Sequence, residues 1–297
     1  MPSGLLLVDK PGGPTSHGIV SQTRKALGLK KVGHAGTLDP MATGLLVLGV
    51  GQGTKLLTYC VGLDKAYEAT IRLGMTTSTD DAEGESDVVA SPEILDALGE
   101  DAIRDALHEF VGDILQVPST VSAIRVDGKR AYERHRAGEE VVLAPRPVTI
   151  SLIDVRSIRR KHPWWDVDIR VECSSGTYIR AIARDLGAAL GVGGHLTALR
   201  RTRVGPFNVQ DACSPEDISE SQLQSLAEAS GELMPQVALT AAQAQDMSHG
   251  KKVFLTAERG AEGVPVACIS PDGELVNISS ITDGVARSLV GFPREGV

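Results

Sequence analysis

Residues 33–55, GHAGTLDPMATGLLVLGVGQGTK, decide how this chain of 297 residues is interpreted. They place one carboxylate, Asp39, in a short polar loop directly before an apolar run, Leu45 to Val50. Because Pro40 follows, Asp39 is biased away from helical geometry and toward an extended one. A catalytic carboxylate is commonly presented in this way, at a loop tip beside a buried strand. An Asx turn, in which the side chain bonds its own backbone, explains the same residues, and spacing alone favours it.

The end of this stretch, GVGQGTK at residues 49–55, has the composition of a phosphate-binding loop but not its spacing. A P-loop requires a Gly-Lys pair, whereas Thr54 stands directly before Lys55. Thr54 also takes the place of the last glycine in the dinucleotide-binding pattern. We therefore predict a structural role for these residues and no nucleotide cofactor.

The periodicity of the first 210 residues predicts a mixture of strands and helices. Residues 75–87 are polar and rich in turn-forming types, so we predict a mobile loop there. Strands arrive as hairpins rather than as strand–helix–strand units, which favours an α+β fold with a mixed, mainly antiparallel sheet. The predicted strands are 5–8, 45–50, 66–74, 150–158 and 164–173, and the predicted helices are 19–28, 92–111 and the end of 174–191.

Composition changes near residue 212, where an acidic segment, 212–232, is predicted to be a helical connector. From 233 onward the chain becomes β-rich, and Asp272-Gly273 between apolar runs predicts a hairpin turn. We therefore expect a first domain at 1–232 and a small β-rich domain at 233–297.

Several function classes are disfavoured by composition. No apolar run approaches the ~20 residues of a membrane span, and the N-terminus lacks a signal-peptide pattern. The cysteines stand singly, without metal-ligand spacing, so we expect no metal and a reduced, cytoplasmic setting. Nothing resembles a dedicated interface, so we expect a monomer without an obligate protein partner. The four cysteines are Cys60, Cys173, Cys213 and Cys268.

The net charge of −8 conceals a segregated distribution. Residues 76–113 carry 1 basic and 12 acidic side chains, whereas residues 125–210 carry 16 basic and 9 acidic ones. A basic stretch on an acidic chain fits a local polyanion site, although an ordinary solvated surface remains the alternative. Its cations gather in an insertion at 123–150 and in a second cluster: Lys129, Arg130, Arg134, His135 and Arg136, then Arg200, Arg201 and Arg203.

Four further side chains are candidates for chemistry beside Asp39. If Ile179 points into the core at a strand end, Tyr178 and Arg180 share the opposite face. Tyr178 could then stack on a base, and Arg180 could pair with a carboxylate. Tyr67 is one of few aromatic residues and lies on a strand face of small residues, and His34 is a candidate acid or base. Ordinary core packing, surface ion pairing or a backbone-bonded loop histidine explain each residue taken alone.

Taken together, four segments resemble the TruB-type tRNA pseudouridine synthases in order and spacing. The opening GLLLVDKPGGPTSH is also similar to that family's first motif, and the resemblance covers about residues 4–210. It implies an α+β catalytic domain, a basic thumb insertion at about 123–150 and a small PUA-like C-terminal domain. The segments are GHAGTLDPMATGLLVLGVGQGTK, KAYEATIRLG, AIRVDGKRAYERHRAGEEV and CSSGTYIRAIARDLG.

The resemblance also implies an activity, the isomerisation of a T-arm uridine of tRNA, at the position conventionally numbered 55, without a cofactor. Asp39 would be the nucleophile, Arg180 would hold it ionised, and Tyr67 would stack on the flipped uracil and take the proton from C5. The other implied contacts are His34 with the flipped nucleotide, Tyr178 and the backbone of Leu199 with the base, Lys10 with the Asp39 loop, and Lys129 and Arg130 with phosphates.

Two alternatives belong to other classes. An RNA-binding protein that only remodels tRNA would use the same basic insertion but would not need Asp39. A hydrolase that cleaves a glycosidic bond would want two carboxylates flanking that bond, and the Asp39 region supplies one.

Overall fold

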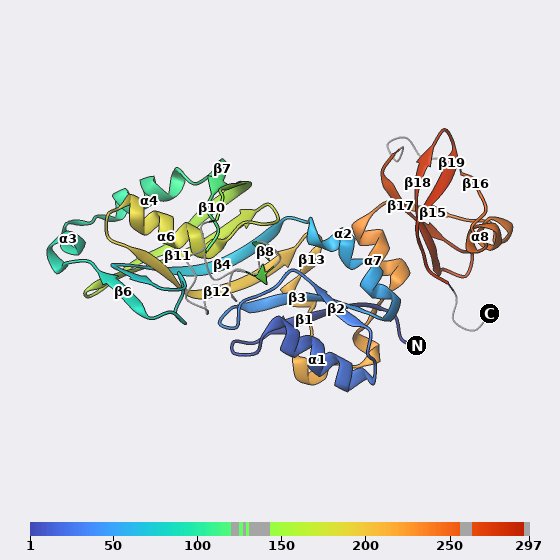
Figure 1. Ribbon diagram of the computed structural model, residues 1–297, viewed down its shortest axis with the longest axis horizontal. Helices are drawn as coiled ribbons and strands as arrows, with labels where there is room; N and C mark the ends of the chain where they lie inside the picture. The colour runs from blue at the N-terminus through green and yellow to red at the C-terminus, as the bar shows by residue number, and fades with distance from the viewer. Residues whose placement is uncertain (120–124, 127–128, 131–142, 256–262, 294–297) are drawn as a thin grey trace.

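The computed structural model describes residues 1–119, 125–126, 129–130, 143–255 and 263–293. Figure 1 shows an elongated molecule in which a long curved sheet occupies most of the length and a smaller sheet, near the C-terminus, lies at one end. The predicted thumb, 123–150, falls largely outside the described residues. The sequence also predicts a small helix at the centre of the thumb, and that segment lies outside them too.

The large sheet has ten strands and is mixed, because β12 and β3 are paired in parallel while its other strand pairs are antiparallel. This confirms the predicted fold class. Its main order is β14 (Gln224–Ser225), β1 (Gly4–Lys10), β3 (Thr43–Val50), β12 (Gly194–Val204), β4 (Lys65–Leu73), β11 (Trp164–Cys173), β10 (Arg146–Lys161) and β7 (Gly112–Gln116), with β2 (Val32–Ala35) beside β3 and β13 (Phe207–Asn208) beside β12.

Alternation along β4 decides which face of the sheet is buried. Tyr67, Ala69 and Ile71 point into the main core, as predicted. The helices α4 (Glu100–His108) and α6 (Ile179–Ala189) pack on this side (Figure 1). The buried face therefore carries Tyr67 toward the N-terminal end of α6.

The first helix, α1 (Ser16–Leu27), ends where the sequence predicted. The Thr15 side chain accepts a hydrogen bond from the Gly18 amide at its start, and Gly28 closes it in the left-handed conformation with φ 63°. Ile19 and Val20 face the core beneath β1 and β3.

The structure corrects three local predictions. Residues 75–87 are not a loop throughout, because β5 (Met75–Thr77) pairs with β6 (Ser86–Val89). The segment 92–111 forms two helices, α3 (Pro92–Ala97) and α4, since Leu98 is extended and Gly99 caps α4. β2 lies inside what was predicted as loop; it is half-buried and lacks an apolar pattern of its own.

The smaller sheet has five strands in the order β15 (Gln236–Ala238), β17 (Pro265–Ile269), β18 (Leu275–Thr282), β19 (Val285–Gly291) and β16 (Val253–Phe254). Gly273, with φ 78°, lies in the turn between β17 and β18, which confirms the predicted hairpin. One helix, α8 (Ala241–Ser248), interrupts this β-rich segment. The connector ends in α7 (Leu226–Leu233).

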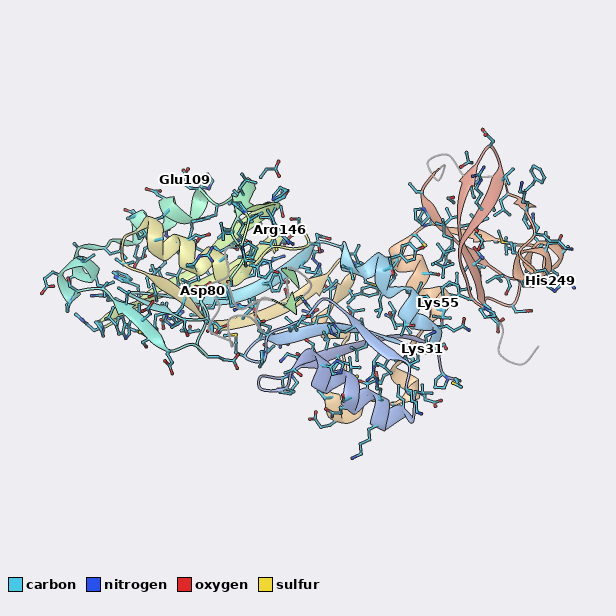
Figure 2. The ribbon with its side chains drawn as sticks, viewed as in Figure 1. Lys31, Lys55, Asp80, Glu109, Arg146 and His249 are labelled. Carbon is cyan, nitrogen blue, oxygen red and sulfur yellow. The ribbon has the colours of Figure 1, made fainter. Side chains whose placement is uncertain are left out.

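The former P-loop candidate lies at the junction of the two sheets. Residues 51–55 form a short 3-10 helix, η1 (Gly51–Lys55). Lys55 Nζ donates to the Gly291 carbonyl at 2.6 Å, and Gln52 Nε2 donates to the Pro293 carbonyl at 2.9 Å. Figure 2 shows Lys55 near the small sheet. These contacts support the predicted structural role of GQGTK.

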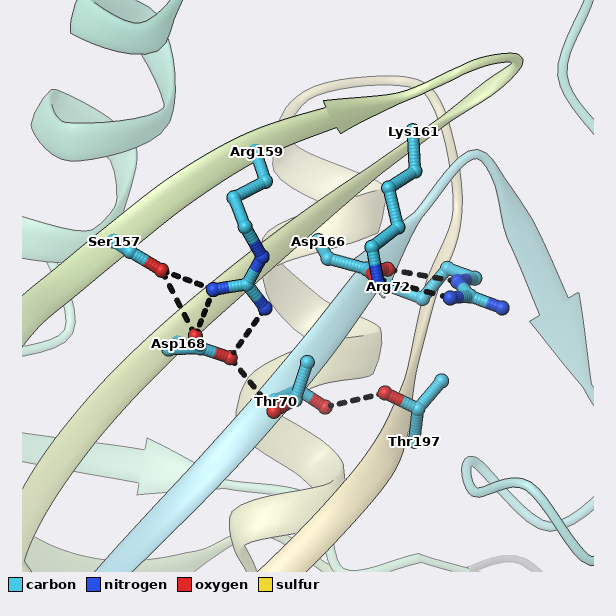
Figure 3. Close-up of polar contacts among 8 residues, drawn as sticks. All are labelled: Thr70, Arg72, Ser157, Arg159, Lys161, Asp166, Asp168 and Thr197. Atoms are coloured by element: carbon cyan, nitrogen blue, oxygen red, sulfur yellow. Dashed lines mark hydrogen bonds and ion pairs between the residues drawn. The ribbon is translucent and has the colours of Figure 1, made fainter.

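The face of β4, β10 and β11 opposite the core carries a network of charged side chains (Figure 3). Asp168 accepts hydrogen bonds from Arg159 and, at 2.8 Å each, from the hydroxyls of Thr70 and Ser157. Asp166 pairs with Arg72 at 2.8 Å and with Lys161 at 3.0 Å. Cations of the basic stretch are therefore neutralised by carboxylates of neighbouring strands.

This network makes a testable contribution to stability. Arg159, and then Thr70 and Ser157, hold the pKa of Asp168 down to about 2. Because the folded pKa lies below the unfolded value of about 4, the stabilisation is complete above about pH 4 and is lost as the pH falls toward 2. We expect Asp168→Asn to lower the free energy of unfolding at pH 7 by about 1–2 kcal/mol.

Urea denaturation at pH 7 and at pH 3 measures this effect. Asp154→Asn, which breaks an exposed pair with Arg156 on the same sheet, is the matched control and is expected to cost less than about 0.5 kcal/mol. Equal losses for the two variants would contradict a special contribution from Asp168.

Candidate active site

A cavity of about 280 Å³ opens where the Asp39 loop, β4, β12 and the start of α6 meet. Its lining includes five residues predicted from the sequence to act together: Asp39, Tyr67, Tyr178, Arg180 and Leu199. The remaining lining residues are Gly36, Thr37, Leu38, Val61, Lys65, Ser175, Gly176, Thr177, Ile179 and Arg201.

The Asp39 loop is fixed on both sides of the carboxylate. Ser16 Oγ donates to the Leu38 carbonyl at 3.0 Å and accepts from the Leu38 amide at 2.8 Å. The Pro40 carbonyl accepts from Lys10 Nζ at 3.1 Å and from the Gly13 amide at 2.9 Å. Residues on β1, the following loop and the start of α1 therefore hold the aspartate in place, which fits the expected contact of Lys10 with this loop.

The turn and the carboxylate of Asp39 are separate features. The backbone makes the turn, since the Ala42 amide donates to the Asp39 carbonyl at 3.1 Å. The side chain instead faces Arg180, whose Nε lies 3.0 Å from Asp39 Oδ2. The Asx-turn interpretation, favoured by spacing alone, is wrong for the side chain, because an ion pair outcompetes a local bond to the backbone.

Arg180 is 4% exposed, and its partners among the described residues include two carboxylates and a backbone carbonyl. Besides Asp39, its Nη1 donates to the Thr79 carbonyl at 2.8 Å and lies 3.4 Å from Asp81 Oδ2. The predicted strand end is wrong here, because Tyr178 caps α6 and Arg180 lies in its first turn. The predicted convergence of the two side chains on one cavity is nevertheless confirmed.

Asp81 is a functional candidate that the sequence did not indicate. It is 3% exposed and comes from the 75–87 segment, which was predicted to be a mobile loop. Its carboxylate also accepts hydrogen bonds from the Thr79 hydroxyl and from the Glu83 amide. A second Asp beside Asp80 in a polar stretch carries no sign of burial, so the sequence offered no means of finding it.

The electrostatics of Asp39 are a balance of opposing effects. Burial raises the pKa of its carboxyl above the ordinary value. Arg180 lowers the pKa, Asp81 raises it and Lys10 lowers it, and the net result is a raised pKa. Arg180 thus favours the ionised form, as expected, but does not fully offset desolvation.

Tyr67 and Arg201 lie opposite each other in the pairing of β4 and β12. Tyr67 is 7% exposed, and burial raises the pKa of its phenol, while the neighbouring Arg201 guanidinium lowers it. Arg201 itself is 1% exposed and cannot grip phosphates as the sequence suggested.

The other members of the second basic cluster also have partners within the protein. Arg200 pairs with Asp9 at 2.7 Å, and Arg203 pairs with Asp64 at 2.8 Å. The prediction of a second phosphate-binding cluster is therefore wrong for Arg201, because that side chain is buried, and is weakened for its neighbours.

Like Lys10, His34 does not line the cavity, and the side chains of Lys129 and Arg130 lie outside the described residues. His34 lies on β2, opposite Leu48 of β3, and does not line the cavity. Lys129 and Arg130 form β9 (Lys129–Arg130), paired with β8 (Arg125–Val126), and their side chains lie outside what the structure describes.

Lys65 lines the cavity although the sequence did not single it out. It is 6% exposed, and its Nζ donates to the carbonyls of Val61 at 3.2 Å and Leu63 at 2.6 Å. Desolvation, helped by Arg201, lowers its pKa to about 8. Its position two residues before Tyr67, in the segment KAYEATIRLG, was the sequence feature that could have indicated it.

The described residues show neither a metal-binding cluster nor a membrane-spanning helix. No group of three or more His, Cys, Asp or Glu is placed there to hold a metal ion. Within the same part of the chain, no helix is long and apolar enough to cross a membrane. The cavity thus offers one half-buried carboxylate, one buried phenol and several cations for chemistry.

Comparison with known families gives a consistent result. The model of the TruB family pseudouridylate synthase N-terminal domain matches residues 24–179, and the model of the tRNA pseudouridylate synthase B C-terminal domain matches residues 180–239.

Curated relatives match nearly the whole chain. The tRNA pseudouridine synthase B of Leifsonia xyli subsp. xyli is 53% identical over 296 residues, which cover 99% of this chain and 98% of the relative. The protein of the same name from Arthrobacter sp. is 51% identical over 300 residues, covering 98% and 97%.

Solved structures share the fold. Cbf5 in a Cbf5-Nop10-Gar1 complex aligns with a TM-score of 0.74 and 26% identity, over 98% of this chain and 86% of that one. A chain of an H/ACA RNP bound to a substrate RNA containing 2′-deoxyuridine aligns with a TM-score of 0.70 and 25% identity, over 98% and 86%.

Proposed function

The chain belongs to the TruB family of pseudouridylate synthases, and from this premise we propose that it converts the T-arm uridine 55 of tRNA to pseudouridine with Asp39 as nucleophile. Curated relatives with about half of their residues identical are named tRNA pseudouridine synthase B, so the chain is an isomerase that acts on tRNA. The observation that carries the proposal is the Asp39 carboxylate, held by Arg180 in a cavity lined by Tyr67, Tyr178 and Leu199.

The reaction makes three demands on the site. The bond between C1′ and N1 must break, the uracil must turn, and C5 must bond to C1′. Reactants and product have the same atoms and oxidation state, so the reaction requires neither a redox partner nor a cofactor. Asp39 attacks the nucleotide or assists a glycal route, and an acylal, a Michaelis adduct and a glycal all fit a single oriented carboxylate.

The remaining residues serve the base. Tyr67 stacks on the flipped uracil and takes the C5 proton, while Tyr178 and the Leu199 backbone contact the base edge. His34 stabilises the flipped-out nucleotide from outside the cavity lining. Lys10 supports the loop through the Pro40 carbonyl, 3.1 Å from its Nζ.

Two alternatives fit the site less well. Asp81 supplies a second carboxylate, but it lies behind Arg180 and is not among the residues that line the cavity, so it does not flank a glycosidic bond as a hydrolase requires. A purely RNA-remodelling protein has no use for a desolvated carboxylate whose pKa is raised.

The proposal also includes the division of the chain into domains, its oligomeric state and its location. We divide the chain into a catalytic domain at 1–232, with its thumb at about 123–150, and a PUA-like domain at 233–297. The protein acts as a monomer in the cytoplasm and needs no protein partner.

The proposed function is tested on unmodified tRNA. We expect nucleoside analysis to show one pseudouridine per tRNA after incubation with the protein, and chemical mapping to place it at position 55. A transcript with cytidine at that position should yield none. Pseudouridine at another position would overturn the assigned target, and none in either transcript would overturn the activity.

Lys129 and Arg130 are expected to contact phosphates and so to offset the few kcal/mol needed to flip a base. Replacing both with alanine should weaken tRNA binding and reduce the slope of log affinity against log salt by up to about 2. The matched control is Arg156→Ala with Lys161→Ala, because both cations are already paired with carboxylates. A slope that equals the wild-type value would contradict phosphate contact at the thumb.

A further inference from the structure

Arg201 has no part in the roles assigned so far, yet it touches both the Asp39 loop and Tyr67. We propose that Arg201 is a positioning residue that fixes the backbone before Asp39 and stabilises the negative charge of the Tyr67 oxygen, so that Tyr67 can accept the C5 proton. This inference rests on the proposed function of Tyr67 and names what makes that function possible.

The first observation is a buried guanidinium whose charge has no carboxylate partner. Arg201 is 1% exposed, and in the described ranges no carboxylate oxygen lies within ion-pair distance of it. Burying an arginine without a counter-ion is costly, and such residues usually have a carboxylate or phosphate beside them. The charge of Arg201 therefore remains available to an anion that forms in the cavity during the reaction.

The second observation is how Arg201 holds the loop. Its donors bond backbone carbonyls: Nε to Leu45 at 2.8 Å, Nη2 to Gly36 at 3.1 Å and Nη1 to Thr37 at 3.4 Å. Gly36 has φ +83°, a conformation that favours glycine, and a Cβ added there would lie 3.5 Å from Arg201 Nη1. The side chain thus fixes the backbone shortly before Asp39.

The third observation is the approach of β12 to β3 at this residue. Arg201 pairs with Gly44 in the parallel register, and a Cβ on Gly44 would lie 2.2 Å from the Arg201 carbonyl oxygen. The strand carrying Arg201 is therefore locked against the strand that follows the Asp39 loop. A side chain anchored in this way has little freedom to move away from Tyr67.

The charges around the Tyr67 hydroxyl make Arg201 the group that favours phenolate. Burial, Cys173 of β11 and the Asp39 carboxylate all raise the pKa of the phenol, and Arg201 of β12 lowers it, so that the net pKa is raised but less than it would be without Arg201. The pKa of the Cys173 thiol is itself raised to about 11, so that group is neutral near pH 7. Lys65 and Arg180 line the same cavity, but Arg201 stands directly opposite Tyr67.

The proton transfer balances without an added reagent. Once C5 has bonded to C1′, it still carries its hydrogen. When the Tyr67 phenolate accepts this proton, the electron pair of the C–H bond restores the C5–C6 double bond and the phenolate becomes a phenol. The Tyr67 phenol then passes this proton through solvent water to N1, which lost its bond to C1′. The phenolate is restored, and the net change is a proton moved from C5 to N1.

The test measures the ionisation of Tyr67 directly. The chain has four tyrosines, so the ultraviolet titration of each protein minus that of its Tyr67→Phe partner isolates this phenol. We expect Arg201→Met to raise the Tyr67 pKa by at least about one unit, and Arg201→Lys to raise it less. Arg200→Met, which removes a charge from the adjacent residue paired with Asp9, should leave it unchanged.

Single-turnover pseudouridine formation as a function of pH is the second readout. The rise in rate that accompanies ionisation of Tyr67 should move to higher pH in Arg201→Met by the same amount as the phenol titration. A folded Arg201→Met protein with an unchanged Tyr67 titration would overturn the proposal and leave Arg201 a structural residue of the loop.

Two outcomes keep this test separate from that of the proposed function. If Arg201→Met does not fold, the test rests on Arg201→Lys. Lost activity in that variant together with a wild-type titration of Tyr67 would overturn the proposed effect of Arg201 on the ionisation of Tyr67. If Tyr67→Phe makes pseudouridine at the wild-type rate, the role of Tyr67 fails and so does the proposal, although the enzyme activity itself stands.

Discussion

Replacing Asp39 with asparagine is expected to abolish pseudouridine formation, with a loss of at least about 10³-fold in the single-turnover rate. Asparagine keeps the size and the loop geometry but removes the negative charge that reacts with the nucleotide. Because binding relies on other residues, the affinity for unmodified tRNA should remain within about threefold of wild type. Nucleoside analysis and a filter-binding titration measure the two quantities.

The same substitution has a second expected result, in stability. Burial raises the pKa of Asp39, so the ionised form is the costly form in the folded protein. Above that raised pKa the folded state is destabilised relative to the unfolded chain, and the cost disappears when the group is neutral. The thermal midpoint of Asp39→Asn at pH 7 should therefore equal or exceed that of wild type.

A control variant separates these effects from general damage. Asp154→Asn removes an exposed carboxylate of β10 that does not line the cavity, and it should change neither rate nor midpoint appreciably. An Asp39→Asn protein that is unfolded would account for inactivity without chemistry, and one that keeps the wild-type rate would exclude Asp39 as the nucleophile.

Local patterns in the sequence predicted those parts of the site that depend on local physics. Pro40 and the apolar run beyond it predicted that Asp39 lies in a loop before a buried strand. Alternation along β4 predicted that Tyr67 lies on the core face. The sequence also predicted the end of α1 at Gly28 and the hairpin after β17. Each of these signals lies within a few residues of the feature that it predicts.

The burial of Asp81 and Arg201 was not predicted, because the residues that surround them come from distant segments of the chain. Asp81 is buried through contacts with Arg180, and nothing in TTSTDDAEG distinguishes it from a solvated aspartate. Arg201 resembled a surface cation beside Arg200, but the parallel pairing of β12 with β3 places its guanidinium under the Asp39 loop. Such burial depends on which strands become neighbours.

The basic and acidic stretches of the sequence are not separated from each other in the folded protein. The basic stretch at 125–210 includes Arg159 and Arg160, which pair with Asp168 and with Asp96 of the acidic stretch. Antiparallel pairing and the position of α3 bring opposite charges together across long sequence separations. A net charge summed over a segment therefore overstates the cations that remain available to RNA.

Arg180 is expected to be nearly as important as Asp39. Arg180→Met removes the ion pair at 3.0 Å that aims the carboxylate, and a misplaced reacting group costs about 10²-fold or more in rate. Arg180→Lys is the matched variant, because it keeps the charge but not the fork that reaches Asp39, Thr79 and Asp81 together. It should recover only a small part of the loss.

Arg180 and Asp81 act on the Asp39 pKa in opposite directions. This difference gives the sharpest test of the arrangement in which Arg180 pairs with both Asp39 and Asp81. Arg180 lowers that pKa, so Arg180→Met should move the acid limb of the single-turnover pH profile to higher pH. Asp81 raises it, so Asp81→Asn should move the same limb to lower pH while reducing the maximal rate, because Arg180 loses one anchor. Shifts in the same direction for both variants would contradict the arrangement in which Arg180 lies between the two carboxylates, because any general loosening of the cavity acts on Asp39 with one sign.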